Sequence, residues 1–283
     1  MVLKEFRAHF TTQLTTLYPK TEVDTFFFLL VEEYLGFQRV NTVLKPDFKV
    51  PDDKMILLEN ALKRLQKEEP VQYILGKTEF YGLPFSVNKH TLIPRPETEE
   101  LVEWILSKVD TTQALNILDI GTGTGCIPIS LAKHLPNAKI STIDVSNKAL
   151  QVAKENAILN NVDIHFMEVD ILQAGNLPIQ YDIIVSNPPY VRELEKVEIK
   201  NNVLENEPHL ALFVDDNNPL LFYNKIADLA KKHLSKSGIL FFEINQYLGK
   251  ETIEMLSQKG FSNIELRKDL FGNNRMTKSS INT

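Results

Sequence analysis

The first quarter of the chain shows the residue spacing of amphipathic helices. Apolar residues recur every three or four positions in FRAHFTTQLTTLY, VDTFFFLLVEEYLGF and DDKMILLENALKRLQKEE. Pro46, Pro51 and Pro70 separate these runs and indicate distinct short helices. The pattern therefore predicts a small helical domain over residues 1–75, of the kind that presents or orients a partner.

The pattern changes after Pro70. The run VQYILGKTEFYGLPFSV alternates aromatic and β-branched residues around Gly76 and Gly82, which predicts a short hairpin. We expect residues 76–90 to link the helical domain to the rest of the chain. The next run, LIPRPETEELVEWILSKV, has prolines at its entry and glutamates in its first turn, as a helix start favours.

Beyond residue 110, strand-like and helical runs alternate. The strand-like runs are LNILDI, KISTID, IHFMEVD, YDIIVS and GILFFEI, and helical runs such as IPISLAKHL and SNKALQVAKENAILNN lie between them. A helix and a closing pair of strands follow at the end of the sequence. This alternation predicts an α/β domain over residues 91–283, with a mostly parallel sheet covered by helices on both faces.

The composition narrows the functional classes. The 283 residues carry a formal net charge of −6, with a sequence pI near 5.6, which argues against a general affinity for nucleic acid phosphates. One cysteine excludes an internal disulfide framework, and the six histidines show no metal-ligand spacing, so no metal site is predicted. We find no signal peptide and no apolar run that could cross a bilayer, and we expect a cytoplasmic protein.

The run ILDIGTGTGC places Gly121, Gly123 and Gly125 directly after a strand, where glycine lets the backbone turn sharply and approach a ligand. The spacing G-x-G-x-G differs from the G-x-G-x-x-G of dinucleotide sites and resembles the S-adenosylmethionine loop of class I methyltransferases. Asp144 ends the next strand, where a carboxylate can accept both ribose hydroxyls. Asp170 ends the third strand, where this fold usually contacts adenine.

The run IVSNPPYV poses a separate question, because two prolines stop a strand and leave a donor-free backbone. An amide nucleophile needs two acceptors for its two N–H bonds. The side-chain carbonyl of Asn187 and the backbone carbonyl of Pro188 can supply them, and Tyr190 offers a flat surface for the planar group. Catalysis of methyl transfer can then rest on positioning and electrostatics, without a covalent enzyme intermediate.

Seven motifs together resemble one family, the peptide chain release factor N5-glutamine methyltransferases (PrmC/HemK family). They are PVQYILGKTEFYG, LIPRPETEELV, LDIGTGTGCI, IDVSNKAL, IVSNPPYV, NEPHLAL and RKDLFGNNR. The resemblance covers residues 65–277, and the family also carries a helical amino-terminal domain. It implies a class I methyltransferase fold, Rossmann-like with a mostly parallel seven-stranded sheet, that uses S-adenosylmethionine and releases S-adenosylhomocysteine.

The resemblance also implies a substrate, namely the glutamine in the Gly-Gly-Gln tip of class I release factors, which a monomer would modify. The implied catalytic residues are Asn187, Pro188 and Tyr190, and the implied substrate-binding residues are Asn187, Pro188, Pro189 and Tyr190. The implied cofactor-binding residues are Gly121, Thr122, Gly123, Thr124, Gly125, Asp144, Asp170, Ile171 and Asn187. The family often has an aromatic residue where this chain has Ile171, and DDNNPLLF lacks the glycine that often follows NEPHLAL.

Two other readings compete with this one. A nucleic-acid amino-methyltransferase could use the same NPPY residues, but it would require a basic surface. An adaptor that binds the cofactor without catalysis would not need Asn187. Glu243, at another strand end, has a supporting contact or a role in the fold, and Cys126 is expected to pack in the core.

Overall fold

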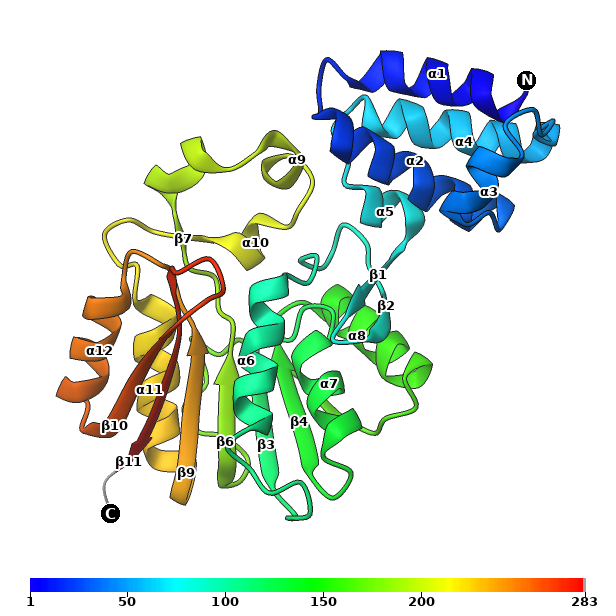
Figure 1. Ribbon diagram of the computed structural model, residues 1–283. Coiled ribbons are helices and arrows are strands. Elements are labelled where there is room, and N and C mark those ends of the chain that lie inside the picture. The colour runs from blue at the N-terminus through cyan, green and yellow to red at the C-terminus, as the bar shows by residue number, and fades with distance from the viewer. Residues whose placement is uncertain (282–283) are drawn as a thin grey trace. The chain divides into compact units, whose positions relative to one another are not determined.

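The computed structural model describes residues 1–281, and these form two compact units (Figure 1). The first unit comprises Met1–Gly76 together with Lys200–Asn206. The second comprises Lys77–Ile199 and the described residues from Glu207 onward. The sequence pattern gave no sign that Lys200–Asn206 packs with the helical unit, where Asn206 donates from Nδ2 to the carbonyl of Glu68 over 3.3 Å.

The first unit is helical. Its helices are α1 (Leu3–Leu14), α2 (Lys20–Leu35), α3 (Arg39–Leu44), α4 (Asp52–Leu65), α5 (Val71–Leu75) and α9 (Asn201–Leu204). Pro19, Pro51 and Pro70 sit at the N-caps of α2, α4 and α5, where a missing backbone N–H costs nothing. Buried residues recur at helical spacing in α1, so Phe6 and Phe10 meet Phe27 of α2 in an aromatic cluster at the centre of the unit.

The second unit is built on a seven-stranded sheet of order β10-β11-β9-β6-β3-β4-β5. The strands are β3 (Asn116–Ile120), β4 (Lys139–Asp144), β5 (His165–Glu168), β6 (Tyr181–Ser186), β9 (Leu234–Glu243), β10 (Phe261–Lys268) and β11 (Asn274–Ile281). β5, β4, β3, β6 and β9 run parallel, and β11 and β10 pair antiparallel at one side. The fold class predicted from the sequence is therefore confirmed.

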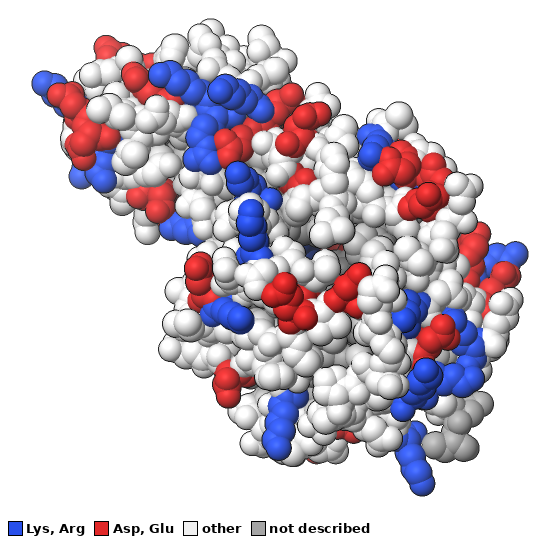
Figure 2. Space-filling model, turned by 180° about the vertical axis from the view of Figure 1, so that it is seen from behind, with Lys and Arg blue, Asp and Glu red and all other residues white. Residues whose placement is uncertain are grey.

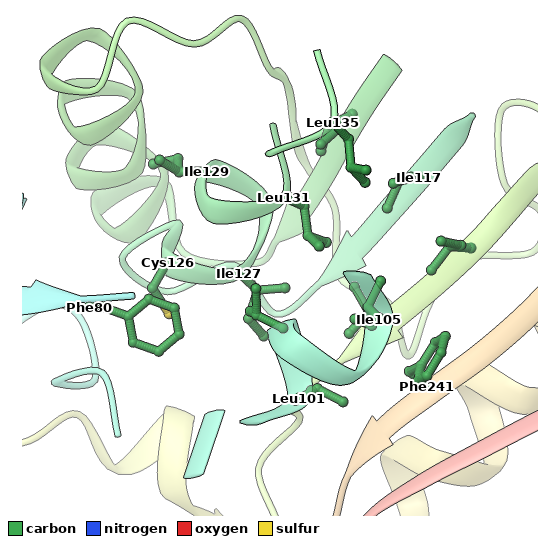
Figure 3. Packing of buried hydrophobic residues seen from close by; sticks show 14 of the residues in the cluster. Phe80, Leu101, Ile105, Ile117, Cys126, Ile127, Ile129, Leu131, Leu135 and Phe241 are labelled. Carbon is green, nitrogen blue, oxygen red and sulfur yellow. The ribbon is translucent and has the colours of Figure 1, made fainter. Parts of the chain in front are cut away.

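Helices cover both faces of this sheet (Figure 1). Ile117 of β3 and Phe241 of β9 pack with α6 (Pro96–Leu106), α7 (Cys126–His134) and α8 (Asn147–Leu159), and Figure 3 shows part of this cluster. The adjacent residues Leu118 and Phe242 pack on the opposite face with α11 (Leu221–His233) and α12 (Gly249–Gln258). Because consecutive side chains of a strand point to opposite faces, these apolar runs fill two cores at once.

The remaining elements of this unit are short. They are the hairpin β1 (Lys77–Phe80) and β2 (Leu83–Ser86), the parallel pair β7 (Val191–Arg192) and β8 (Phe213–Val214), the 3-10 helix η1 (Glu193–Glu198) and α10 (His209–Leu212). The side chain of Asn156 in α8 joins the hairpin to the glycine loop. Its Oδ1 accepts from the backbone N–H of Ser86, and its Nδ2 donates to the backbone carbonyls of Ser86 and Thr124. Among residues 1–281, no helix combines the length and the apolar composition that a bilayer span requires.

Candidate functional site

A cavity of about 270 Å³ opens at the carboxyl ends of β3, β4, β5 and β6. Residues of the second unit alone line it. The lining includes the whole run from Ile120 to Thr124, Asp144, Asp170, Ile171, and Asn187 with both following prolines. Open parallel sheets bind ligands at this edge, and the topology brings the predicted residues there from four different strands.

The glycine loop turns as its sequence predicts. Gly121, Gly123 and Gly125 all have positive φ, at +85°, +54° and +81°. The loop is anchored by Gly121, whose N–H donates to the carbonyl of Ile143 over 2.8 Å. A Cβ on Gly125 would lie only 2.8 Å from Cδ1 of Ile129, so close packing against α7 also demands glycine at this position.

Asp144 lies beside this loop, and its carboxylate already orders the local backbone. Oδ2 accepts from the N–H of Gly123 over 2.9 Å, and Oδ1 accepts from the N–H of Ser146 over 2.8 Å. Burial raises the pKa of Asp144, although these backbone donors oppose the shift. Each oxygen retains a further lone pair, so the carboxylate can still accept hydroxyl donors.

Asp170 and Ile171 follow β5 and also line the cavity. Asp170 is exposed, and its Oδ1 accepts from the N–H of Leu172 over 2.9 Å, which fixes the turn. Ile171 is buried within the apolar cluster under α11. The pair presents one apolar and one polar surface to the cavity, the combination that a nucleoside base needs.

Asp119 is a buried carboxylate next to the cavity lining, bonded to Thr122, and the sequence interpretation did not single it out. It is fully buried in β3, and its Oδ2 accepts from the hydroxyls of Thr122 (2.6 Å) and Thr142 (2.7 Å). Its Oδ1 has no hydrogen-bond partner within residues 1–281, and burial raises the pKa of Asp119 to about 6. An acidic residue inside an apolar strand, two positions before the glycine loop, was the available signal.

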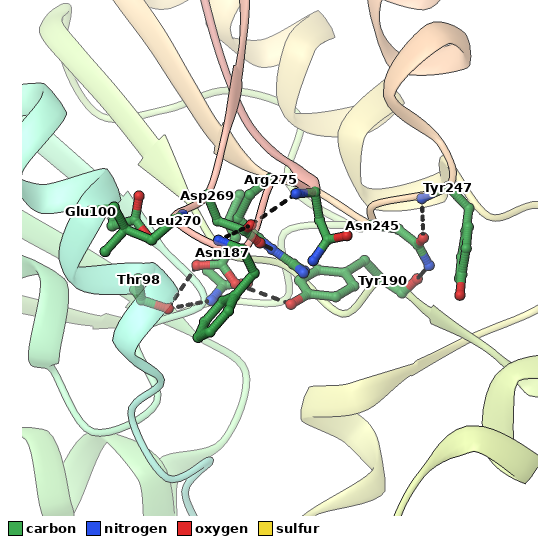
Figure 4. A network of polar contacts seen from close by, with 12 residues as sticks. Thr98, Glu100, Asn187, Tyr190, Asn245, Tyr247, Asp269, Leu270 and Arg275 are labelled. Carbon is green, nitrogen blue, oxygen red and sulfur yellow. Dashed lines mark hydrogen bonds and ion pairs between the residues drawn. The ribbon is translucent and has the colours of Figure 1, made fainter.

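Asn187 follows β6 and is held from the side by α6. Its Nδ2 donates to Oγ1 of Thr98 over 3.3 Å, and that hydroxyl donates in turn to Oε2 of Glu243 over 2.7 Å (Figure 4). Because the carboxylate can only accept, the Thr98 hydroxyl donates its hydrogen to Glu243 and accepts from Asn187 through a lone pair. The arrangement leaves Oδ1 of Asn187 as the acceptor available to a ligand.

Tyr190 is placed differently from the other NPPY residues. Asn187, Pro188 and Pro189 line the cavity, whereas Tyr190 does not. Its hydroxyl donates to Oε1 of Glu243 over 3.0 Å, and Asn245 donates to its backbone carbonyl over 2.9 Å. Burial, with the nearby Glu243 carboxylate, raises the pKa of Tyr190, so the phenol keeps its proton and remains a donor.

Glu243 thus connects both ends of the NPPY segment to the fold. It is almost fully buried, burial raises its pKa, and the hydroxyls of Thr98 and Tyr190 together with the charge of Arg275 oppose that shift. Arg275 in turn donates from Nε to Oδ2 of Asp269 over 3.1 Å. Of the two roles considered for Glu243, the structure supplies the supporting contact.

Thr98, Arg275 and Asp269 were not singled out as functional residues, and the motifs IPRPETE and RKDLFGNNR that contain them were the available signal.

A second ion pair fixes the cavity wall. Arg95 lines the cavity, and its Nη2 lies 2.6 Å from Oε1 of Glu207. The other oxygen, Oε2, accepts from the backbone N–H of Ile93 over 3.1 Å. Glu207 is buried and fully paired, so it ties the segment before α6 to the segment before α10.

Comparison with known families gives two matches along the chain. The model described as PrmC N-terminal domain matches residues 5–76, and the Methyltransferase small domain matches residues 99–212. Over 98% of this chain and 99% of its own length, the release factor glutamine methyltransferase of Flavobacterium psychrophilum is 55% identical. The chain belongs to the family of release factor glutamine methyltransferases.

Further relatives of the family agree. The release factor glutamine methyltransferase of Bacteroides thetaiotaomicron is 42% identical over 97% of this chain and 98% of its own length. Among solved structures, a methyltransferase from Pyrococcus furiosus is similar with a TM-score of 0.52 at 17% identity, covering 80% of this chain and all of that one. This structural similarity concerns the fold alone. The family membership and the fold class inferred from the sequence are confirmed, and the roles of individual site residues stay predictions.

Proposed function

We propose that this release factor glutamine methyltransferase transfers the methyl group of S-adenosylmethionine to the side-chain nitrogen (N5) of the glutamine in the Gly-Gly-Gln motif of class I release factors, and so modulates translation termination. The observation that carries the proposal is one cavity that joins the glycine loop and Asp144 to Asn187 and Pro188. A methyl donor and an amide acceptor must meet in one place, and this cavity offers both sets of residues together.

The residues present suit S-adenosylmethionine. The loop residues 121–124 would hold its amino-acid end, with Gly125 packed behind them against Ile129 and Ala153. The remaining lone pairs of Asp144 would hold its ribose hydroxyls, and Asp170 with Ile171 its adenine. When bound, this cofactor supplies a methyl group on a positively charged sulfur. The leaving group would be a neutral thioether, so the site needs no cationic group to stabilise it.

The protein's task is to orient a poorly nucleophilic amide. Oδ1 of Asn187 and the backbone carbonyl of Pro188 would accept the two N–H bonds of the target amide. The Thr98 contact favours this orientation of Asn187, because it occupies Nδ2 and leaves Oδ1 free. As the new C–N bond forms and the C–S bond breaks, one amide proton is lost to solvent, and no covalent enzyme intermediate is required.

Tyr190 acts from behind the segment in this proposal. Because Tyr190 does not line the cavity, its ring would support the backbone that carries Asn187 and Pro188, and its hydroxyl bond to Glu243 fixes the ring's place. Pro189 restricts the backbone between Asn187 and Tyr190 and keeps both side chains in register. The helical unit would supply further contacts to the release factor, and we expect the enzyme to act as a monomer in the cytoplasm.

A nucleic-acid amino-methyltransferase is the alternative with the same catalytic chemistry. Its substrate would require a basic surface, and the chain carries a net charge of −6. Figure 2 shows basic and acidic side chains interspersed over the visible face of the described residues. This charge distribution favours a protein substrate.

The deciding experiment is a labelled-methyl transfer assay with purified release factor beside the same factor carrying Gln→Ala in its Gly-Gly-Gln tip. We expect incorporation into the first protein only. Incorporation into both would place the methyl group elsewhere and overturn the proposed acceptor. Absence of incorporation, with cofactor binding intact, would direct the search to nucleic acids and then to a non-catalytic adaptor.

A further inference from the structure

The loop between β10 and β11 exposes two large apolar side chains. Leu270 is 88% exposed and Phe271 is 75% exposed. Neither belongs to the apolar clusters of the second unit. Adjacent apolar side chains held out in water bring no stability to the fold, so their presence suggests a contact with another molecule.

The loop is nevertheless ordered by hydrogen bonds. Oδ1 of the buried Asp269 accepts from the N–H groups of Phe271 (3.0 Å) and Asn273 (2.9 Å), and its backbone carbonyl accepts from Gly272 (2.9 Å). Gly272 has a φ of +86°, which the tight turn requires. These bonds use the backbone N–H groups of residues 271–273 and do not involve the side chains of Leu270 and Phe271. The conformation is thus fixed before any partner arrives.

The same loop is bonded to the elements of the catalytic site. The N–H of Leu270 donates to Oε1 of Glu100 over 3.1 Å. Glu100 lies two residues after Thr98 in α6, and Thr98 lines the cavity and contacts Asn187. Figure 4 shows Leu270 beside this part of α6, in the same network as Asn187. At the other end of the loop, Arg275 bonds Asp269 and its charge acts on Tyr190 and Glu243. Hydrogen bonds therefore connect the loop that carries the apolar pair to the elements of the site proposed to bind glutamine.

We propose that Leu270 and Phe271 form a docking surface for the release factor, which contacts apolar side chains of the segment that flanks the target glutamine. This inference rests on the proposed function. The amide pocket recognises only the end of one side chain, so the flanking segment must be held by contacts outside the cavity. A pre-formed apolar pair on a loop bonded to α6 supplies such contacts with little loss of conformational entropy on binding.

The first test is steady-state methylation of intact release factor by the full-length enzyme and by its Leu270→Ser, Phe271→Ser and double variants. The double variant should raise KM for the release factor about tenfold or more, as the loss of a buried apolar anchor does. The kcat at saturation and the Kd for S-adenosylmethionine should stay at wild-type values. The matched control is Ile158→Ser, because Ile158 of α8 is 77% exposed and should leave every constant unchanged.

An unchanged KM in the double variant would overturn the docking surface, while methylation by the wild-type enzyme would leave the proposed function intact. Failure of the wild-type enzyme to methylate release factor would instead refute the function on which the inference rests. A second measurement identifies the occupant, using Phe271→p-benzoylphenylalanine and photo-cross-linking to release factor. Cross-links to residues flanking the glutamine support the proposal. Cross-links only to distant parts of the release factor, or to a second copy of the enzyme, contradict it.

Discussion

The hydroxyl of Thr98 donates to Oε2 of Glu243 over 2.7 Å, across 145 positions of the sequence. Oγ1 of Thr98 also accepts from Nδ2 of Asn187 over 3.3 Å. One buried carboxylate thereby determines which way a hydroxyl points, and the hydroxyl determines which end of the Asn187 amide faces the cavity. Glu243 and Thr98 are positioning residues in this scheme, because they act on substrate only through Asn187.

Replacing Thr98 by valine keeps the shape of the side chain and removes the hydroxyl. We expect kcat to fall about tenfold or more, because Asn187 loses the contact that sets its orientation, while cofactor affinity stays unchanged. Thr98→Ser retains the hydroxyl and should restore most of the activity. The measurement is kcat and KM for release factor beside the Kd for S-adenosylmethionine. Equal kcat values for Val and Ser at this position would show that the hydroxyl does not orient Asn187.

Asn187→Ala removes the proposed acceptor itself. Turnover should fall roughly 10²-fold or more, by analogy with the loss of one preorganised polar contact in a transition state. Cofactor affinity should remain nearly at the wild-type value, and titration calorimetry with S-adenosylmethionine checks that the pocket is still formed. Turnover near the wild-type rate would mean that the assigned role of Asn187 is wrong.

Asp144→Ala tests the other end of the cavity. Binding of S-adenosylmethionine should weaken by about 1–3 kcal/mol, because hydrogen bonds to the ribose hydroxyls are lost. Asp163→Ala is the control, since Asp163 is exposed and does not line the cavity. Calorimetry on both variants gives the comparison. A dissociation constant unchanged by the loss of Asp144 would contradict its proposed contact with ribose.

The residues at the strand ends that line the cavity were predictable, because each belongs to a recognisable local motif. A glycine triplet after one strand, a carboxylate after the next and an amide with two prolines after a third are all readable along the chain. The rule that parallel strands share a carboxyl edge then brings them together. The structure agrees, since a Cβ on Gly121 would lie 3.6 Å from the backbone carbonyl of Asn187.

The supporting contacts were not predictable in the same way. Thr98 and Glu243 meet only because α6 packs on the face of β9, and no local pattern states that packing. The placement of Tyr190 behind the cavity depends likewise on Glu243, and the association of Lys200–Asn206 with the helical unit depends on contacts far apart in sequence. Sequence patterns indicate elements and strand ends, whereas such pairings are decided by tertiary packing.

Two glycines of the loop allow backbone strain to be separated from crowding. Gly123→Ala meets open space but has positive φ, so it should lower the free energy of unfolding by about 1–2 kcal/mol. Gly125→Ala adds a clash with Ile129 and a 3.2 Å approach to Cβ of Ala153, and it should cost about 1–3 kcal/mol more. Urea unfolding of both variants checks the order. Equal destabilisation would show that α7 and α8 yield enough to admit the methyl group.

Asp119 provides a pH-dependent test of the buried strand. Burial raises its pKa from 3.8 to about 6 in the folded state, so folding favours the protonated carboxyl. The folded protein then binds more protons than the unfolded chain between these two values, and the stability that Asp119 contributes falls as pH rises through this window. At pH above about 7 the Asp119 carboxyl is ionised in both the folded and the unfolded state, so the full free-energy cost of burying its charge is present.

Asp119→Asn should remove this dependence, because the amide does not titrate. The free energy of unfolding of the wild type minus that of the variant should therefore decrease by about 2 kcal/mol between pH 4.5 and pH 7.5. Carboxylates elsewhere in the chain affect both proteins equally, so the difference isolates Asp119. Urea unfolding at intervals across this range gives the curve. Parallel stability profiles would mean that Asp119 is ionised throughout, with Thr122 and Thr142 outweighing the effect of burial.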